Sequence, residues 1–383
     1  MKNKFSRYGA ALVAAGIFCG CEGLQIERAI KGNAADWLMF GGSPSRINQT
    51  GSSLKPPLKL LWQYDAGAGI TATPLVRDNI LLVATLKGEL HAVNIVTGKR
   101  IGYLTLDGAV TGTPVWNGTD VCIPISTENE TAESISLVNG AKNWMTKLGP
   151  SESSLLKYER SLYVTTLNGV LYCLNASGGN DLWKFETAPE ELREPIRSSP
   201  ATDGDVVVFG CDDGCIYAVK RADGTRRWKF QTGRSVFASP IITQGRVIVG
   251  SLDGNIYCLD ASNGSLRWKF DAHARIFGSA SSNGNCVFFG TADGYCYALD
   301  IADGKVVWKF GAKSVINSAP LVTGDFLYVG CLDKNLYALN IATGAQVWQY
   351  ETDGRIRVSP VEWNGMLFVT SEDSYVTAFK EAE

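Results

Sequence analysis

The amino-acid sequence predicts an all-β fold: an eight-bladed β-propeller of four-stranded antiparallel blades, closed by an N-terminal strand that completes the last blade. Three observations lead to this prediction. Repeats of about forty residues recur, four of which contain stretches that align without gaps, and a tryptophan stands at a fixed place in most of them. The last repeat lacks one strand, and a single strand stands alone near the N-terminal end. The composition agrees, because 41 glycines and 10 tryptophans in 383 residues suit short strands joined by tight turns.

Each repeat is expected to contain four strands. In the repeat from Ser239 to Phe270, a short strand begins near Ser239-Pro240, and the apolar run Val247–Gly250 forms the second strand. Asp253-Gly254 is a hairpin signal, and the third strand leads through a glycine turn to the strand that carries Trp268. These runs are apolar at nearly every position, which indicates sheets covered on both faces, as stacked blades would be.

The tryptophan positions give the number of blades. Six tryptophans each stand four residues after a turn glycine: Trp144, Trp183, Trp228, Trp268, Trp308 and Trp348. In the first repeat the same offset from Gly98 leads to Gly102 instead. A seventh tryptophan, Trp62, lies in the strand that stands alone before the first repeat. We interpret these seven tryptophans as structural residues that dock one blade against the next.

The two ends of the repeat region explain how the ring closes. Three strands follow Trp348, and the fourth strand of that repeat is missing. The strand around Trp62 supplies it if the ring is closed, which also removes an open sheet edge. An open solenoid would have no need to divide one repeat between its two ends. The propeller is therefore assigned to residues 60–383.

The residues before the propeller are expected to form three segments. Residues 1–20 read as a signal peptide, with a basic start and an apolar run too short to cross a bilayer. Phe18-Cys19-Gly20-Cys21 resembles the bacterial lipobox, which implies lipidation of Cys21, a tether over residues 21–35, and an outer-membrane lipoprotein facing the periplasm. Cleavage near Gly20 without a lipid is the alternative. Residues 36–59 would be a strap that precedes the propeller.

One face of the disc is predicted to be specialised for binding. The turns after strands two and four share this face, and the repeats differ in length there, in residues 127–134 and 187–196. Basic residues recur in the later connections from strand four to strand one. The candidate partner-binding arginines are Arg193, Arg197, Arg234, Arg275, Arg355 and Arg357. Arginine suits bidentate contacts with a protein partner or an anionic ligand, whereas solubilising charge on exposed loops is the alternative.

We find no motif for catalysis or metal binding in the sequence. The two histidines, His91 and His273, are far apart and have no ligand spacing around them, so no metal site is expected. The formal charge of −2 gives no sign of a nucleic-acid surface. Cys211 and Cys215 flank a three-residue turn that would set them opposite each other, so they could form a disulfide; free buried thiols are the alternative.

The repeats resemble a known family. Ala298-Leu299-Asp300, Asp303-Gly304 and Trp308 are similar to the tryptophan-docking motif of quinoprotein-like β-propellers, which are named for pyrroloquinoline quinone (PQQ). Asp36-Trp37 and Gly41-Gly42 are similar to the segment that precedes such propellers. The resemblance implies the fold over residues 36–383, and it leaves the function open because this architecture hosts both enzymes and scaffolds.

Within that family, the chain most resembles the BamB-like outer-membrane assembly lipoproteins in size, anchoring and short loops. This resemblance implies a protein partner in the barrel-assembly machinery. It also implies that Leu192 and Arg193 belong to a protruding contact loop. The chain departs from the assembly lipoproteins at Arg234-Ser235-Val236, where they carry acidic residues.

Two classes of function follow from these observations. The first is a non-catalytic exported scaffold for protein–protein binding, with no cofactor and with membrane contact only through the N-terminal lipid. The second is a quinoprotein dehydrogenase that oxidises alcohols or sugars with PQQ and calcium. Enzymes of that class add long loops that bury the cofactor. The connections here are near the minimum length, which favours the scaffold.

Overall fold

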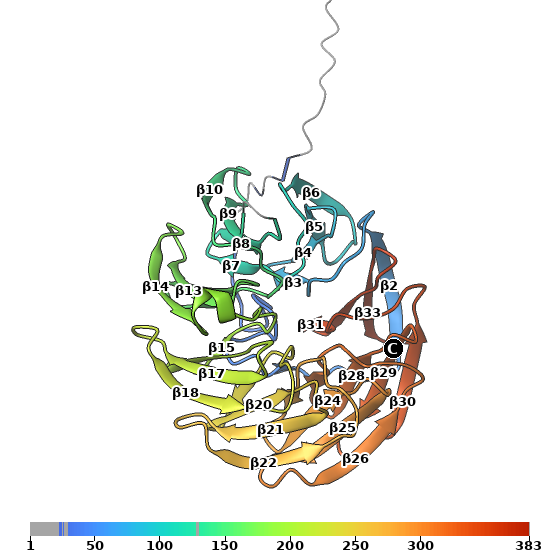
Figure 1. The fold of residues 1–383 in the computed structure, drawn as a ribbon. Coiled ribbons are helices and arrows are strands. Elements are labelled where there is room, and N and C mark those ends of the chain that lie inside the picture. The colour runs from blue at the N-terminus through green and yellow to red at the C-terminus, as the bar shows by residue number, and fades with distance from the viewer. Residues whose placement is uncertain (1–22, 25, 27–29, 128–129, 383) are drawn as a thin grey trace, which may run out of the picture.

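A computed structural model describes residues 23–24, 26, 30–127 and 130–382. Eight sheets are arranged around one axis, and the chain passes from each to the next in sequence order (Figure 1). The predicted eight-bladed all-β propeller is therefore confirmed. The only helical element among the described residues is a 3-10 turn, η1 (Glu190–Leu192). None of these residues belongs to a helix long and apolar enough to cross a membrane.

The strands of each blade follow one another outward from the axis. Blades 1 and 2 contain β3 (Leu75–Arg77), β4 (Ile80–Ala84), β5 (Glu89–Asn94), β6 (Arg100–Thr105), β7 (Val115–Asn117), β8 (Asp120–Pro124), β9 (Ala132–Ser136) and β10 (Lys142–Thr146). Blades 3 and 4 contain β11 (Leu156–Tyr158), β12 (Ser161–Thr165), β13 (Val170–Asn175), β14 (Asp181–Glu186), β15 (Ala201–Thr202), β16 (Val206–Gly210), β17 (Cys215–Lys220) and β18 (Arg226–Gln231). Blades 5 and 6 contain β19 (Ile241–Thr243), β20 (Arg246–Gly250), β21 (Asn255–Asp260), β22 (Leu266–Asp271), β23 (Ser281–Ser282), β24 (Cys286–Gly290), β25 (Tyr295–Asp300) and β26 (Val306–Gly311). Blade 7 contains β27 (Leu321–Thr323), β28 (Phe326–Gly330), β29 (Asn335–Asn340) and β30 (Gln346–Glu351).

Blade 8 combines the two ends of the propeller. Its inner strands are β31 (Val361–Trp363), β32 (Met366–Thr370) and β33 (Tyr375–Glu381), and its outer strand is β2 (Leu58–Asp65). β2 runs antiparallel to β33, with Leu58 opposite Glu381 and Asp65 opposite Tyr375. The closure predicted from the missing strand is therefore present, and β2 begins at Leu58 rather than at the expected residue 60.

Burial differs between the inner and outer strands of a blade. In β20, the residues from Val247 to Gly250 are all buried. In the outer strand β22, buried and exposed residues are mixed, and Trp268 is the one buried side chain. The inner strands lie between neighbouring blades and are covered on both faces, whereas the outer strands form the rim of the disc.

The tryptophans of the outer strands join neighbouring blades. At six joints the indole Nε1 donates a hydrogen bond of 2.8–3.2 Å to a carbonyl of the next blade: Trp62 to Ile95, Trp144 to Ala176, Trp183 to Arg221, Trp228 to Ala261, Trp268 to Ile301 and Trp308 to Ile341. At each of these joints the ring also covers the turn glycine three residues beyond that carbonyl. Gly264, for example, has φ +74°, and a Cβ there would lie 2.6 Å from Cδ2 of Trp228.

The seventh tryptophan packs differently. Trp348 meets blade 8, whose outer strand comes from the N-terminal side, so no glycine turn joins the last two strands there. Its ring contacts Phe379 edge-on instead, with the ring centroids 5.8 Å apart.

Hydroxyl groups near the axis link the short segments that lead into the innermost strands of neighbouring blades. Backbone amides donate to hydroxyls at 2.9–3.1 Å in the series Thr73 to Thr113, Thr113 to Ser154, Ser154 to Ser199, Ser199 to Ser239, and Ser239 to Ser279, and again from Ala319 to Ser359. These bonds satisfy amides that no strand pairs, so a small hydroxyl residue at a spacing of about 40 residues helps to hold the ring together.

Residues 36–54, here called the inner strap, run along the axial side of the ring. Backbone hydrogen bonds of 2.9–3.1 Å join them to the first strands of six blades, through Val76, Trp116, Thr202, Ile242, Ser282 and Val322. A short parallel strand, β1 (Gln49–Thr50), extends the sheet of blade 7. Arg46, only 1% exposed, fixes the strap because its guanidinium donates to Pro200 O at 2.5 Å, Phe40 O at 2.9 Å and Leu155 O at 3.2 Å.

Candidate functional site

The two faces of the disc differ in their loops. The customised face consists of the hairpins between second and third strands and the connections from each outer strand to the next blade. The uniform face consists of the remaining hairpins. On the customised face, residues 187–200 join blade 3 to blade 4, whereas the corresponding connection from blade 4 to blade 5 is residues 232–240. The second unusual loop, between β8 and β9, includes residues 128–129, which lie outside the described residues.

Leu192 stands at the end of η1 in the long connection of the customised face. Its side chain is 71% exposed, more than any other large hydrophobic residue in the described part of the chain. A large apolar side chain at the tip of an inserted loop has no packing role within the blade. It is therefore available for contact with another molecule.

Arg193 holds this loop in place. Its Nε donates to Ala188 O at 2.9 Å, and its Nη2 lies 2.9 Å from Oε2 of Glu186 at the end of β14. The Arg193 side chain is only 14% exposed. Arg193 thus fixes the loop that carries Leu192, and its guanidinium is used mainly in contacts within the chain.

Arg197 and Arg357 are also engaged within the protein. Arg197 forms ion pairs with Asp212 and, at 3.3 Å, with Glu152, and its guanidinium lies over the ring of Phe237. Arg357 pairs with Glu372 at 2.7 Å. The sequence placed these arginines correctly on one face, but it gave no sign of the carboxylates that neutralise them.

The other three candidate arginines are open to solvent. Arg234, Arg275 and Arg355 are exposed, and no side-chain hydrogen bond or ion pair joins any of them to another described residue. Arg234 and Arg275 line two adjoining grooves of about 390 and 430 Å³, together with Leu252. This stretch of the customised face therefore offers two free guanidinium groups beside a partly apolar surface.

A smaller cavity of about 170 Å³ lies on the axis of the ring. Phe237, Phe277 and Asn317 from the blade connections line it, together with the axial hydroxyl residues and Phe40 of the inner strap. Pockets that enclose drug-sized ligands usually measure about 300–1,000 Å³. The lining includes Arg357 but no carboxylate, although calcium in proteins is usually held partly by carboxylate oxygens. The cavity is therefore a poor fit for a quinone held with calcium.

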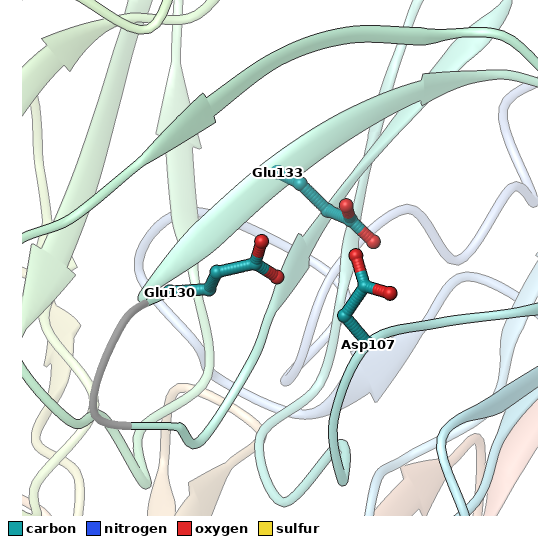
Figure 2. Close-up of side chains that lie close together, drawn as sticks. All are labelled: Asp107, Glu130 and Glu133. Atoms are coloured by element: carbon teal, nitrogen blue, oxygen red, sulfur yellow. The ribbon is translucent and has the colours of Figure 1, made fainter.

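An acidic cluster that sequence reasoning missed lies between blades 1 and 2. Carboxylate oxygens of Asp107, Glu130 and Glu133 come within 4.8 Å of one another (Figure 2). Glu133 falls within residues 127–134, the segment that the sequence assigned to an unusual loop, but it lies in β9 and is fully buried, and burial raises its pKa. Lys142 bridges the cluster, with its Nζ 2.6 Å from Glu133 Oε2 and 2.9 Å from Asp107 Oδ2. This lysine already supplies positive charge to the carboxylates, so we assign no metal to them.

The cysteine pair does not form the disulfide that the sequence allowed. Cys211 and Cys215 do lie on either side of the hairpin, where the Cys211 amide donates to Cys215 O at 2.9 Å. Both are nevertheless free thiols, because their sulfurs face different partners. Sγ of Cys211 contacts Pro195 O at 3.5 Å, and Sγ of Cys215 contacts Oε1 of Gln231 at 3.0 Å.

The two histidines lie in unrelated places. His91 is buried in blade 1, where Nδ1 is 2.7 Å from the Tyr64 hydroxyl, and burial lowers its pKa. His273 is exposed on the customised face beside Asp271. The expected signal peptide and Cys21, the expected lipidation site, lie outside the described residues.

Known proteins share this arrangement. The outer membrane protein assembly factor BamB of Legionella pneumophila is 28% identical over 182 residues, or 45% of this chain and 46% of that protein. The dehydrogenase subunit of the quinone alcohol dehydrogenase of Gluconobacter oxydans is 26% identical over 180 residues, or 45% of this chain and 20% of that protein. The chain thus aligns with less than half the length of these curated relatives.

A solved structure and a family comparison extend this result. The crystal structure of BamB from Moraxella catarrhalis superposes with a TM-score of 0.74 and 17% identity, covering 84% of this chain and 99% of that one. At this identity the match demonstrates the fold. Residues 56–157, 128–269 and 212–371 match the quinoprotein-like family described as outer membrane protein assembly factor BamB. Since these matches together extend from residue 56 to residue 371, the chain belongs to that family.

Proposed function

We propose that this protein is an exported, lipid-anchored scaffold that binds a protein partner through its customised face, in the assembly of outer-membrane β-barrel proteins. The observation that carries the proposal is Leu192, which is 71% exposed on a loop longer than its counterparts in the other repeats. A few residues that become fully desolvated at the centre of an interface carry most of its binding energy, and burying an exposed apolar side chain is itself favourable.

The charges around this loop support the same proposal. Arg193 is used to hold the loop, so the apolar tip is presented in a defined position before any partner binds. Such preorganisation raises affinity because less conformational entropy is lost on binding. Arg234, Arg275 and Arg355 remain free to pair with acidic groups of a partner. Membership of the BamB family supports the barrel-assembly machinery as that partner.

The alternative is a PQQ- and calcium-dependent dehydrogenase acting on alcohols or sugars. It is kept because a quinone alcohol dehydrogenase is among the relatives. The volume and the lining of the axial cavity count against it, as described above.

Two titrations of the purified chain distinguish these functions. In the first, the immobilised chain is exposed to detergent-solubilised barrel-assembly machinery, and we expect saturable binding. In the second, PQQ with calcium is added while tryptophan fluorescence is followed, and we expect no saturable quenching. Binding of PQQ at micromolar concentration, without binding of the machinery, would contradict the scaffold and support the dehydrogenase.

A further inference from the structure

One of the eight blade joints lacks its tryptophan. Between blades 1 and 2, the position on the outer strand β6 is occupied by Gly102, and the turn glycine opposite is Gly140. At six other joints an indole ring fills this space and its Nε1 donates to the carbonyl three residues before the turn glycine. Without a substitute, this joint would contain a void and an unpaired carbonyl.

A segment from the N-terminal part of the chain fills the space. A Cβ on Gly102 would lie 3.1 Å from Leu24 Cα and 3.3 Å from Gly23 O. Leu24 is fully buried. On the other side of the joint, Leu24 O and Cδ2 of Leu104 on β6 would each be 3.5 Å from a Cβ on Gly140. The backbone of this segment, together with the Leu104 side chain, therefore fills the region that an indole ring takes elsewhere.

The same segment also supplies the missing hydrogen bond. The backbone amide of Ile26 donates to Leu137 O at 2.8 Å. Leu137 stands three residues before Gly140, which is the position of the carbonyl that accepts the indole Nε1–H at the other joints. The segment therefore replaces both the packing and the hydrogen bond that the indole provides at the other joints.

Further contacts attach the segment to both blades. Gly23 forms a parallel bridge with Tyr103 of β6, on blade 1. Leu24 and Ile26 belong to the buried cluster that contains Ile135 and Leu137 of blade 2. In Figure 1 the first described residues lie at the rim between β6 and β10. Two blades are thus bridged by residues that the sequence had placed in a tether.

We propose that Gly23, Leu24 and Ile26 form an N-terminal plug that replaces the missing docking tryptophan and fixes the membrane anchor to the rim between blades 1 and 2. The second part rests on the proposed function, because it takes Cys21 as lipidated. Two residues can span at most about 7 Å, so a lipid on Cys21 would be held close to this rim. The plug therefore orients the propeller with one edge toward the bilayer.

Hydrogen exchange of the Ile26 amide tests the plug without any lipid or partner. In the purified chain without a lipid we expect this amide to be protected. We expect Leu24→Asp to reduce the protection by roughly tenfold or more, because a carboxylate cannot be buried there unpaired. Val138→Asp is the matched control, since Val138 is 46% exposed near the same joint. Free exchange of the Ile26 amide in the wild type would overturn the proposal.

Restoring the tryptophan gives a second test. In Gly102→Trp the indole would compete for the space, so we expect the Ile26 amide to lose protection while the ring stays folded by circular dichroism. In that background Leu24→Asp should no longer shift the unfolding midpoint. If Gly102→Trp does not fold, Gly102→Ala serves instead, because its Cβ would press on Leu24. If Leu24→Asp shifts the unfolding midpoint equally in the wild type and in the Gly102 variant, the plug does not take the place of the missing tryptophan.

The orientation is tested on vesicles that carry nitroxide-labelled lipid headgroups. A fluorescent probe on Val138→Cys, beside the plug, should be quenched more strongly than one on Val347→Cys of blade 7, and Leu24→Asp should abolish the difference. Equal quenching of two vesicle-bound proteins would contradict the fixed anchor. Failure of the wild-type protein to bind vesicles at all would instead contradict the lipid anchor of the proposed function.

Discussion

The uniform and customised faces of the disc are built by the same repeats, yet they are constrained differently. On the uniform face, a turn glycine lies under the indole of the preceding blade at six joints, with no room for a side chain. On the customised face, the connection from blade 3 to blade 4 is longer than its counterpart in the next blade and carries an exposed leucine at its tip. Blade docking fixes the turn glycines of the uniform face, whereas one connection of the customised face has been lengthened.

The joint between blades 1 and 2, which lacks a docking tryptophan, also shows how strongly this face is constrained. Where Gly102 replaces the tryptophan, the joint is still filled, by Leu24 and by the Ile26 amide. The space between blades is therefore kept closed even when the usual residue is absent. On the customised face, in contrast, three arginines remain exposed without a side-chain partner among the described residues. Such groups contribute little to stability, which suits a role in binding.

The largest expected effect comes from adding a methyl group under an indole. Gly264→Ala should destabilise the protein by about 2–5 kcal/mol, because a left-handed alanine and a clash with Trp228 add together. Gly245→Ala is the control. Gly245 also has positive φ, at +69°, but its Cβ would meet nothing within 4 Å, so the cost should be about 1–2 kcal/mol. Urea unfolding of both variants measures the difference, and equal losses would contradict the docking constraint.

A smaller effect should separate the arginines of the customised face. Arg197→Ala removes two ion pairs and a contact with the Phe237 ring, and should cost about 1 kcal/mol of unfolding free energy. Arg234→Ala should change it by less than about 0.5 kcal/mol. Denaturant titrations check both values. If Arg234→Ala is the more destabilising of the two, Arg234 has a structural partner. The separation of paired arginines, such as Arg197, from exposed ones would then be wrong.

The smallest effect concerns pH. Although burial alone would raise the pKa of Asp253, hydrogen bonds from the Tyr257 hydroxyl at 2.6 Å and from backbone amides lower it. A lowered folded-state pKa adds stability above the unfolded value of about 4, and this stability is lost as the pH falls through the folded pKa. Tyr257→Phe should therefore destabilise the protein more at pH 7 than at pH 3. If Tyr257→Phe lowers the free energy of unfolding equally at pH 7 and at pH 3, the Tyr257 hydroxyl does not lower the pKa of Asp253.

The repeats made much of the fold predictable. The strand order, the closure by the strand around Trp62 and the face that carries the unusual loops all followed from regular spacing. Contacts between distant residues did not follow. The burial of Glu133 beside Lys142, the pairing of Arg197 with Asp212 and the docking of Leu24 depend on side-chain placement across blades, which no local pattern encodes. Gly102 was visible as an exception, but the residue that fills its place was not.

The most direct test of the central claim compares two exposed leucines. Leu192 lies on the customised face at 71% exposure, and Leu182 lies on the outer strand β14 at 51% exposure. We predict that Leu192→Asp weakens binding to the barrel-assembly machinery at least tenfold, or about 1.4 kcal/mol, while Leu182→Asp leaves the affinity unchanged. Equal affinities of wild type and Leu192→Asp, or a selective loss in Leu182→Asp, would show that the partner does not bind through the customised face.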